Sequence, residues 1–425
     1  MNEDVIVSAV EAASVESVAE AAAISGADTA WILVSTALVL LMTPAVGLFY
    51  GGLVRKKNVL STLMYSFFTV AIVSVVWVLA GYSLAFGSSV GGFIGGLDHI
   101  GLHGVGTDPI AGQTIPALLF MAFQMTFAII TPALISGAFV ERKAFGPYIA
   151  FTSLWSLVVY APVAHWVWGG GFLSEDGALD YAGGTVVHIT SGVSALVCAW
   201  VIGRRDGLGS EKIEPHNATM TVLGASLLWF GWFGFNAGSA LAADGAAANA
   251  LVTTNSAAAM GAIVWLAIGA IHHKRPSVIG AAVGAVAGLV GITPAAGFVS
   301  PMSALAIGAL TSGICYVVTE FLVKGRIDDA LDVFGVHGVG GIVGALLTGV
   351  FASEAIGGTA GAIEGNWMQV LIQAKAVLAA AIYAGVLTFV ILKVIELVAP
   401  IRVSPEQESQ GLDLTVHGEH AYDPA

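Results

Sequence analysis

The most constraining feature of this chain is a succession of apolar runs, each about twenty residues long, separated by short polar breaks. A helix of about 20 residues covers the roughly 30 Å thickness of the hydrocarbon core of a bilayer. Soluble domains carry about a quarter charged residues, whereas only 10% of these 425 residues are charged and 57% are hydrophobic. The sequence therefore predicts an all-α polytopic membrane protein.

The apolar runs predict about eleven transmembrane helices. We expect them near residues 31–50, 62–87, 115–140, 147–168, 184–203, 219–241, 250–272, 278–296, 302–324, 335–352 and 368–398. Lys and Arg occur in every second loop, beginning with Arg55 after the first run, and the alternate loops contain acids instead. Positive loops stay on the cytoplasmic side of a membrane. We therefore expect the N-terminus outside and the C-terminus inside.

Three regions follow from this pattern. Residues 1–30 are acidic, lack the basic start of a signal peptide and predict an extracellular extension. Residues 31–400 form the transmembrane domain, and residues 401–425 form a cytoplasmic tail. One charge breaks the pattern, because Lys375 lies in the last run near its outer end. We expect Lys375 to snorkel or to pair in an interface.

Two histidines lie inside apolar runs, His188 in GGTVVHITSG and His337 in DVFGVHGVGG. The two stretches share Val-His, and a Gly follows each His four residues later. They belong to the fifth and tenth predicted spans, so the two copies cross the membrane in opposite directions. This pattern predicts a five-plus-five inverted repeat followed by a long last helix, with a shared site near the midplane.

Two readings of the histidine pair stay open. The imidazoles could simply satisfy each other and nearby backbone carbonyls. An ionisable side chain at membrane depth is nevertheless expensive and usually marks a substrate or proton pathway. A low dielectric disfavours the imidazolium, and a neutral imidazole offers one donor and one acceptor. A lining of this kind suits a small neutral polar molecule and could relay protons.

An aspartate precedes each histidine, Asp180 before His188 and Asp332 before His337. Both predict helix N-caps, since the partial positive charge of a helix N-terminus favours a carboxylate. On the outer side, Asp180 could also stabilise an arriving cation electrostatically. Asp332, on the inner side, is expected to act only as a cap.

Aromatic residues accompany these motifs in MAFQMTF, VWGGGF and WFGFNAGS, which contain Phe123, Phe127, Trp168, Phe235 and Ser239. Stripes of Phe and Trp are commonly core or interface residues. An external group of Trp, Phe and one hydroxyl also holds a small cation, through cation–π attraction and a hydrogen bond. Both interpretations stand at this point. Cys198 and Cys315 lie in apolar runs and predict packing residues only.

The order of the motifs resembles the ammonium transporter (Amt/Mep/Rh) family, of the prokaryotic Amt type. The resemblance extends from about Trp31 to Tyr422. It is carried by GLFYGGLVRKKNVLS, AFQMTFAIITPALISGAFVER, VAHWVWGGGF, LDYAGGTVVHI, GWFGFNAGSA, GITPAAG, DVFGVHGVGGIVG and GLDLTVHGEHAY.

The resemblance implies roles for individual residues. Its external ammonium site corresponds to Trp168, Phe127 and Ser239, with Phe123 beside it, and its phenyl gate to Phe127 and Phe235. The pore and proton-relay residues are His188, His337 and Asp180. The tail becomes a regulatory segment, in which Gly411, Thr415, His417, Glu419 and Tyr422 are the matching residues.

The resemblance also implies a function and partners. We expect a multi-pass protein of the plasma or inner membrane that forms a homotrimer and binds a PII-type signal protein on its cytoplasmic face. It would recruit ammonium outside, deprotonate it and conduct ammonia, with separate proton transfer and hence electrogenic uptake; methylammonium is a further candidate substrate. Alternatives are a passive ammonia channel, an ammonium sensor or transceptor, and, most distantly, a haem protein. No enzymatic activity, cofactor, metal or nucleic-acid partner is expected.

Overall fold

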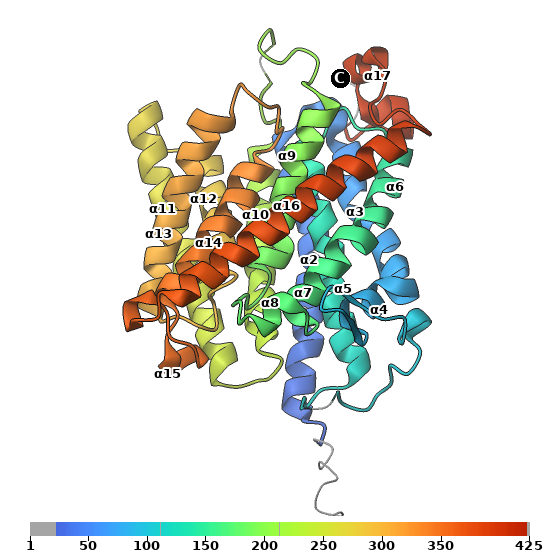
Figure 1. Cartoon of the computed structure of the whole chain (residues 1–425). Coiled ribbons are helices and arrows are strands. Elements are labelled where there is room, and N and C mark those ends of the chain that lie inside the picture. Colours follow the sequence, from blue (N-terminus) through green and yellow to red (C-terminus); the bar gives the residue numbers. More distant parts are fainter. Residues whose placement is uncertain (1–22, 111, 212, 423–425) are drawn as a thin grey trace, which may run out of the picture.

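Long helices run side by side through the described part of the chain, which comprises residues 23–110, 112–211 and 213–422 of the computed structural model (Figure 1). The predicted extension 1–30 lies mostly outside these residues. Helices of the first half are α2 (Gly26–Leu53), α3 (Val59–Val76), α4 (Tyr82–Phe86), α5 (Ala117–Ile135), α6 (Phe145–Trp155), α7 (Ala161–Trp168), α8 (Phe172–Glu175) and α9 (Thr190–Ile202). A hairpin of β1 (Ser89–Val90) and β2 (Ile94–Gly95) follows α4.

The second half contains α10 (Ala218–Ala237), α11 (Gly245–His273), α12 (Val278–Ile292), α13 (Pro301–Val317), α14 (Val339–Phe351) and α15 (Glu354–Gly357). The long α16 (Met368–Glu396) and the short α17 (Pro405–Gln410) complete the chain. Two π-helical turns, η6 (Gly184–Ile189) and η9 (Phe334–Gly338), lead into α9 and α14. The prediction of an all-α membrane protein is confirmed.

Within the described residues, ten helical segments are long and apolar enough to cross a membrane. The predicted eighth span is the exception, since α12 has 15 residues and covers only about 22 Å at 1.5 Å per residue. It ends at Ile292, two residues before Pro294, because a proline lacks the N–H that a continuing helix needs. The count of eleven spans therefore stays a prediction.

The first helices of the two halves, α2 and α10, pack along each other. Glycines of α10 make the contact close: a Cβ on Gly224 would lie 2.3 Å from the backbone nitrogen of Phe49. A Cβ on Gly231 would lie 2.9 Å from the carbonyl oxygen of Leu38. Small residues therefore let the backbones of the halves approach, as in other membrane bundles.

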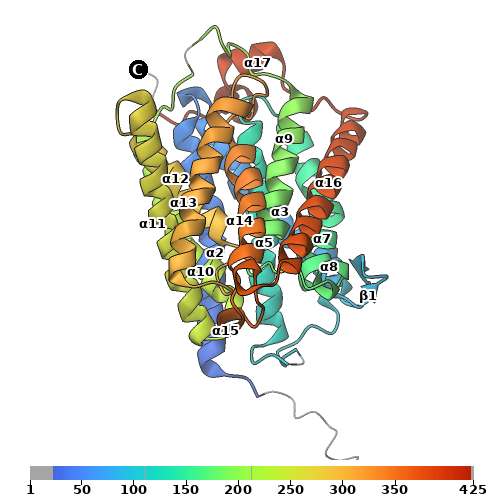
Figure 2. The same ribbon diagram turned by 60° about the vertical axis from the view of Figure 1, so that its left-hand side comes forward.

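The last long helix, α16, crosses the outside of the bundle obliquely (Figures 1 and 2). Its Gln373 reaches inward, where its side chain donates to the Leu179 carbonyl and accepts from the Leu179 N–H, both at 2.7 Å. Near the start of the helix, the ammonium of Lys375 pairs with Asp176 at 2.5 Å and lies 5.8 Å from the Phe172 ring centroid. Of the two expectations for Lys375, snorkelling or pairing, the structure shows pairing, with Asp176 as the partner.

The start of α2 and the tail helix α17 lie at opposite ends of the bundle (Figure 1). We call the end that carries α17 the tail face. Which face of the membrane each end meets stays a prediction from the basic loops.

Candidate functional site

The two intramembrane histidines meet in the interior of the bundle. The Nδ1 atoms of His188 and His337 lie 3.2 Å apart, and the rings are stacked at 5.3 Å between centroids. Two neutral imidazoles can share this bond, since one Nδ1 donates and the other accepts. The Nε2 of His188 is buried and has no hydrogen-bond partner among the described residues. The pair therefore satisfies itself only in part and leaves a polar atom for a ligand.

The repeat glycines bring the histidines together. His188 lies in η6 and His337 in η9, so each histidine occupies a π-helical turn. A Cβ on Gly192 would lie 2.1 Å from the backbone nitrogen of Gly338, beside His337. A Cβ on Gly341, the matching glycine of the other copy, would lie 2.9 Å from the Gly184 carbonyl oxygen. Each copy thus uses its glycine to contact the histidine-bearing turn of the other.

Asp180 caps the turn that carries His188. One carboxylate oxygen accepts from the N–H groups of Gly183 and Gly184 at 2.9 and 2.6 Å. The other accepts from Thr185 and Val186 at 2.8 and 3.1 Å. Burial raises the pKa of the Asp180 carboxyl to about 6, although these four N–H groups lower it. The capping reading of Asp180 is confirmed; its action on a cation stays a prediction.

In the second copy, Asp329 and not Asp332 provides the cap. The Asp329 carboxylate accepts from the Phe334 N–H at 2.7 Å, at the start of η9. Asp332 lies in a left-handed turn, with φ of 58°, and its side chain lines a cavity. The expectation that Asp332 caps the helix was wrong, because the cap is set by the course of the loop and not by distance from His337 along the chain.

A continuous row of aromatic contacts leads to the histidines. Trp168 packs edge-on against Phe127 at 5.9 Å between centroids, and Phe127 packs against Phe235 at 4.4 Å. The Phe235 ring lies 6.1 Å from that of His188, nearly parallel to it. Phe127 and Phe235 are each 1% exposed, whereas Trp168 is half-buried. The row thus runs from a partly open tryptophan to the closed centre of the bundle.

The remaining residues of the expected external site adjoin this row. Phe123 packs edge-on against Phe127 at 5.0 Å. The Ser239 hydroxyl donates to the Phe235 carbonyl at 2.8 Å, so its oxygen remains able to accept. The Trp168 indole N–H donates to the Asp180 carbonyl at 2.9 Å. Ring faces and an acceptor oxygen suit a small cation with N–H donors.

Two cavities meet at the histidines. The first, which we call the pore cavity, lies between His188, His337, Trp232 and Phe235 and leaves about 10 Å³ for the centre of a water-sized molecule. About 10–15 Å³ by this measure holds one water, so one ammonia-sized molecule fits and a haem macrocycle does not. The second, the tail-face cavity, has about 380 Å³ by the same measure and also reaches His337. Together the cavities join the histidines to the tail face.

Sequence reasoning missed two residues of this pathway. Tyr50 lines both cavities, and its hydroxyl donates to the Leu134 carbonyl at 3.1 Å. Trp232 stacks on His188 at 5.5 Å between centroids. Both belong to motifs that carried the family resemblance, GLFYGGLVRKKNVLS and GWFGFNAGSA. Nothing in their spacing distinguished them from core aromatics.

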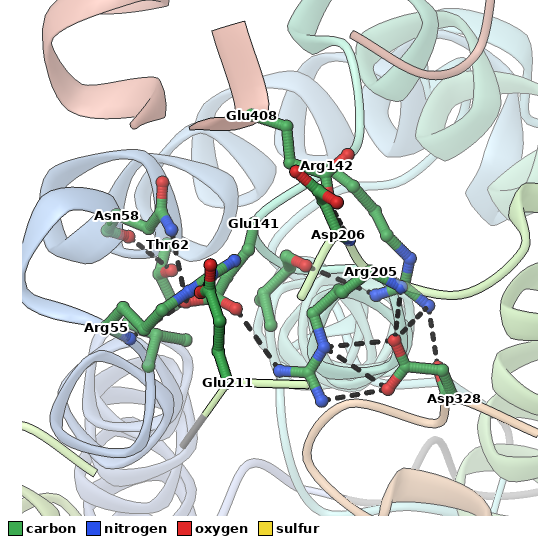
Figure 3. Close-up of polar contacts among 12 residues, drawn as sticks. Arg55, Asn58, Thr62, Glu141, Arg142, Arg205, Asp206, Glu211, Asp328 and Glu408 are labelled. Atoms are coloured by element: carbon green, nitrogen blue, oxygen red, sulfur yellow. Dashed lines mark hydrogen bonds and ion pairs between the residues drawn. The ribbon is translucent and has the colours of Figure 1, made fainter. Parts of the chain in front are cut away.

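A buried charge network, which we call the tail-face network, closes the bundle beneath the tail (Figure 3). Glu141 accepts from Arg55 Nε at 3.1 Å and from Arg205 Nη1 at 3.2 Å. Arg205 also pairs with Asp328 at 2.8 Å. Burial opposes ionisation of Glu141, but Arg205 and Arg55 outweigh it, so that the pKa of this carboxyl falls below its ordinary value. Glu408 of α17 joins the network by accepting from the Asp206 N–H at 2.6 Å.

The expected regulatory residues lie along the docked tail. Gly411 has φ of 107°, and a Cβ there would lie 2.6 Å from Cβ of Lys57. The Thr415 hydroxyl donates to the Gly411 carbonyl at 2.7 Å, and the His417 ring lies 5.4 Å from the Phe145 ring. The Glu419 N–H donates to the Asp413 carbonyl, and the Tyr422 hydroxyl lies 3.0 Å from Nε2 of His216. Sequence reasoning missed Asp413, whose carboxylate accepts from the N–H groups of Leu60 and Ser61 at the start of α3.

Comparison with known proteins identifies the family of the chain. The family profile described as Ammonium Transporter Family matches residues 30–422. The chain is similar to the ammonium transporter of Bacillus subtilis, with 52% identity over 93% of this chain and 98% of the relative. It is also similar to ammonium transporter Amt1 of Archaeoglobus fulgidus, with 46% identity over 94% of this chain and 100% of the relative.

Solved structures share the fold. The crystal structure of Saccharomyces cerevisiae Mep2 aligns with a TM-score of 0.85 at 38% identity, covering 90% of this chain and 88% of that one. A solved structure called Sensor Amt Protein aligns with the same TM-score at 31% identity, covering 92% of this chain and 98% of that one. Together with the long apolar helices, these similarities identify a multi-pass protein of the cell membrane.

Proposed function

Because the chain belongs to the ammonium transporter family, we propose that it takes up ammonium by capturing the ion outside and conducting ammonia through the histidine-lined pore. The observation that carries this proposal is the unbroken row of contacts from Trp168 through Phe127 and Phe235 to the histidine pair. It supplies a cation site, a dry constriction and a polar path in that order.

Capture uses the open end of the row. The ammonium ion lies against the ring faces of Trp168 and Phe127 and donates an N–H to the Ser239 oxygen, with Phe123 on its flank. Cation–π attraction at a partly desolvated site contributes about 1–2 kcal/mol. Asp180 is a buried carboxylate whose backbone carbonyl accepts from the Trp168 indole, and its negative charge attracts the cation without contact.

Selection occurs at the gate formed by Phe127 and Phe235. Potassium and ammonium are nearly equal in size, so a size filter cannot separate them. An apolar constriction rejects any ion that must leave its water, at a cost of several kcal/mol or more. Ammonium alone can pass by giving up a proton. The N–H bond breaks, the proton is transferred toward the histidines and Asp180, and neutral ammonia enters the pore cavity.

The histidines then bind ammonia and transfer the proton. Ammonia is about the size of the water that the pore cavity accommodates and bonds to the unpartnered Nε2 of His188. The proton crosses separately over the shared bond between His188 and His337. Ammonia takes up a proton again at the tail face, so one positive charge moves for each molecule carried. Transport of this kind is electrogenic.

The test is current recording on the reconstituted protein with pulses of ammonium and of potassium. The unmodified chain gives a current with ammonium only. The double variant His188→Leu, His337→Leu loses this current. Current of unchanged size and selectivity in the double variant refutes the proton relay, and potassium current in the unmodified chain refutes the apolar filter. Ammonia flux with no charge movement in the unmodified chain leaves the alternative of a passive channel.

Regulation and assembly are proposed alongside transport. We propose a homotrimer with one pore in each subunit, and a PII-type signal protein that binds at the tail face. The docked tail supports such a role, since α17 enters the tail-face network through Glu408. The similarity to Sensor Amt Protein favours an ammonium sensor as the second candidate. A sensor would bind ammonium with no current.

A further inference from the structure

The tail-face cavity is much larger than the cargo proposed for the pore. Its volume is about 380 Å³ against about 10 Å³ for the pore cavity, measured alike. It extends from His337 and Tyr50 past α12 to the loop that precedes η9. Ammonia needs only a path through this space. The excess room is of the size that holds a small organic molecule.

Two carboxylates in this cavity have no cation partner. Asp328 pairs with Arg205, but Asp329 and Asp332 form no ion pair among the described residues. Asp329 is 6% exposed; its Oδ2 caps η9, and its Oδ1 is buried without a hydrogen-bond partner in that part of the chain. The nearby Lys324 instead pairs with Glu320 at 2.9 Å. Arg205 and Lys324 also line the cavity, but each pairs with another acid, so the cavity contains two carboxyls without an ion-pair partner among the described residues and one unused acceptor atom.

Burial acts on both carboxyls. It raises the pKa of Asp329 to about 6, and burial together with Asp329 raises the pKa of Asp332 to about 7. The nearest cations, Lys324 and Arg205, lower the pKa of Asp332 by less. Protonation therefore neutralises these carboxyls more readily than exposed ones, and no ion pair with the described residues opposes it. A bound cation would supply the missing partner.

Part of the cavity wall is aliphatic. Ile279 and Val283 of α12 lie on one side, and Leu208, Ile213 and Pro215 of the loop before α10 lie on another. A bare ammonium ion has no apolar group, so these aliphatic side chains would remain in contact with water. A ligand with a charged head and an apolar chain would satisfy both the carboxylates and the walls.

We propose that the tail-face cavity binds a linear primary aliphatic amine, with its ammonium group at Asp329 and Asp332 and its methylene chain along α12. The ammonium donates to the free Oδ1 of Asp329. The bound chain fills the passage to His337 and closes the pore from the tail face. This site does not depend on the proposed ammonia pathway, because binding is measured without transport.

The test is calorimetric titration of the purified full chain in detergent with n-butylamine, n-hexylamine and, as the uncharged control, n-butanol. Butylamine binds and butanol does not. Each added methylene tightens binding about threefold to fourfold, since its burial contributes about 0.8 kcal/mol. Hexylamine therefore binds about tenfold more tightly than butylamine. Ammonium chloride binds more weakly than either amine.

Variants separate this cavity from general surface charge. Asp332→Asn retains the left-handed turn, which Asn tolerates, and weakens butylamine binding about tenfold or more. Glu396→Gln removes an exposed charge from the end of α16, outside the cavity, and changes binding less than twofold. Val283→Phe fills the cavity, abolishes amine binding and leaves both carboxylates in place, which keeps the test decisive if Asp332→Asn fails to fold.

Three results overturn the proposal. They are no heat with butylamine, equal weakening by Asp332→Asn and Glu396→Gln, and equal affinity of butylamine and hexylamine. Amine binding with the expected variant pattern, in a protein that carries neither ammonium current nor ammonia flux, would uphold this site and refute the transport function. Block of the current by hexylamine added at the tail face alone would support both.

Discussion

Replacing Asp180 by Asn should act mainly by lowering the free energy of unfolding, and not by removing a charge that attracts a cation. The carboxylate accepts four backbone N–H groups, two on each oxygen. In Asn one of these oxygens becomes an NH₂ group, which donates and cannot accept. Whichever way the amide is oriented, two buried N–H groups at the start of η6 then face a donor. The turn that carries His188 loses half of its cap.

The expected loss follows from those bonds. A hydrogen bond to a charged group contributes about 1.5–3 kcal/mol, and a buried N–H without a partner costs a similar amount. Two lost bonds therefore lower the free energy of unfolding by about 3–6 kcal/mol. This is large for one substitution, since most point changes cost about 0.5–3 kcal/mol.

The assay is equilibrium unfolding of the purified chain in detergent with a rising fraction of SDS, run beside current recording. Asp244→Asn is the matched control, because Asp244 caps α11 with one bond, to the Ala247 N–H at 3.0 Å. Asn is as good an N-cap as Asp, so this variant should change the unfolding free energy by less than about 0.5 kcal/mol.

One result would refute the reasoning. If Asp180→Asn unfolds within about 1 kcal/mol of the unmodified chain and yet loses the ammonium current, the carboxylate acts mainly through its charge on the ion. Loss of current together with the expected loss of stability, and with an unchanged Asp244→Asn, supports the cap.

Three further substitutions test the packing and the charges. Gly192→Ala pushes the two repeats apart at Gly338 and should lower the free energy of unfolding in SDS by about 3 kcal/mol or more. Gly313→Ala is the control and should leave it unchanged, since the nearest atom to a Cβ there lies 3.8 Å away. Equal effects of the two variants would contradict the close contact at Gly192. Glu141→Gln should lower the unfolding free energy by about 3 kcal/mol at neutral pH. The pKa of Glu141 in the folded chain lies below the ordinary 4.5. The difference in unfolding free energy between the variant and the unmodified chain should therefore be complete above pH 4.5 and vanish as the pH falls through the pKa of the folded state. A difference independent of pH would contradict this reasoning. Burial lowers the pKa of Lys143 from 10.5 to about 8, so the free energy of unfolding of the unmodified chain should rise between pH 8 and 10.5. Lys143→Met should be about 2–3 kcal/mol more stable at pH 7, because it avoids the cost of burying the ammonium. The same pH profile in both proteins would show that this cost is absent.

Apolar length and local motifs were sufficient for the class of fold and for the meeting of the two histidines. A helix near every predicted span follows from the length of each run, because hydrocarbon allows few alternatives to a helix. The inverted order of the histidine motifs already predicted a shared site, and His188 and His337 do meet. Pairing of Lys375 was also predictable, since a lone charge in such a helix needs a partner.

Tertiary structure alone decided which loop residues meet across the chain. The sequence assigned the inner cap to Asp332, but the loop turns so that Asp329 accepts from η9 and Asp332 faces a cavity. The joining of Glu141, Arg205 and Asp328 in one network was equally invisible, since they come from three distant loops. Length and periodicity are properties of a segment and can be read along it. Contacts between loops depend on how rigid helices are placed against one another, and no single segment encodes that placement.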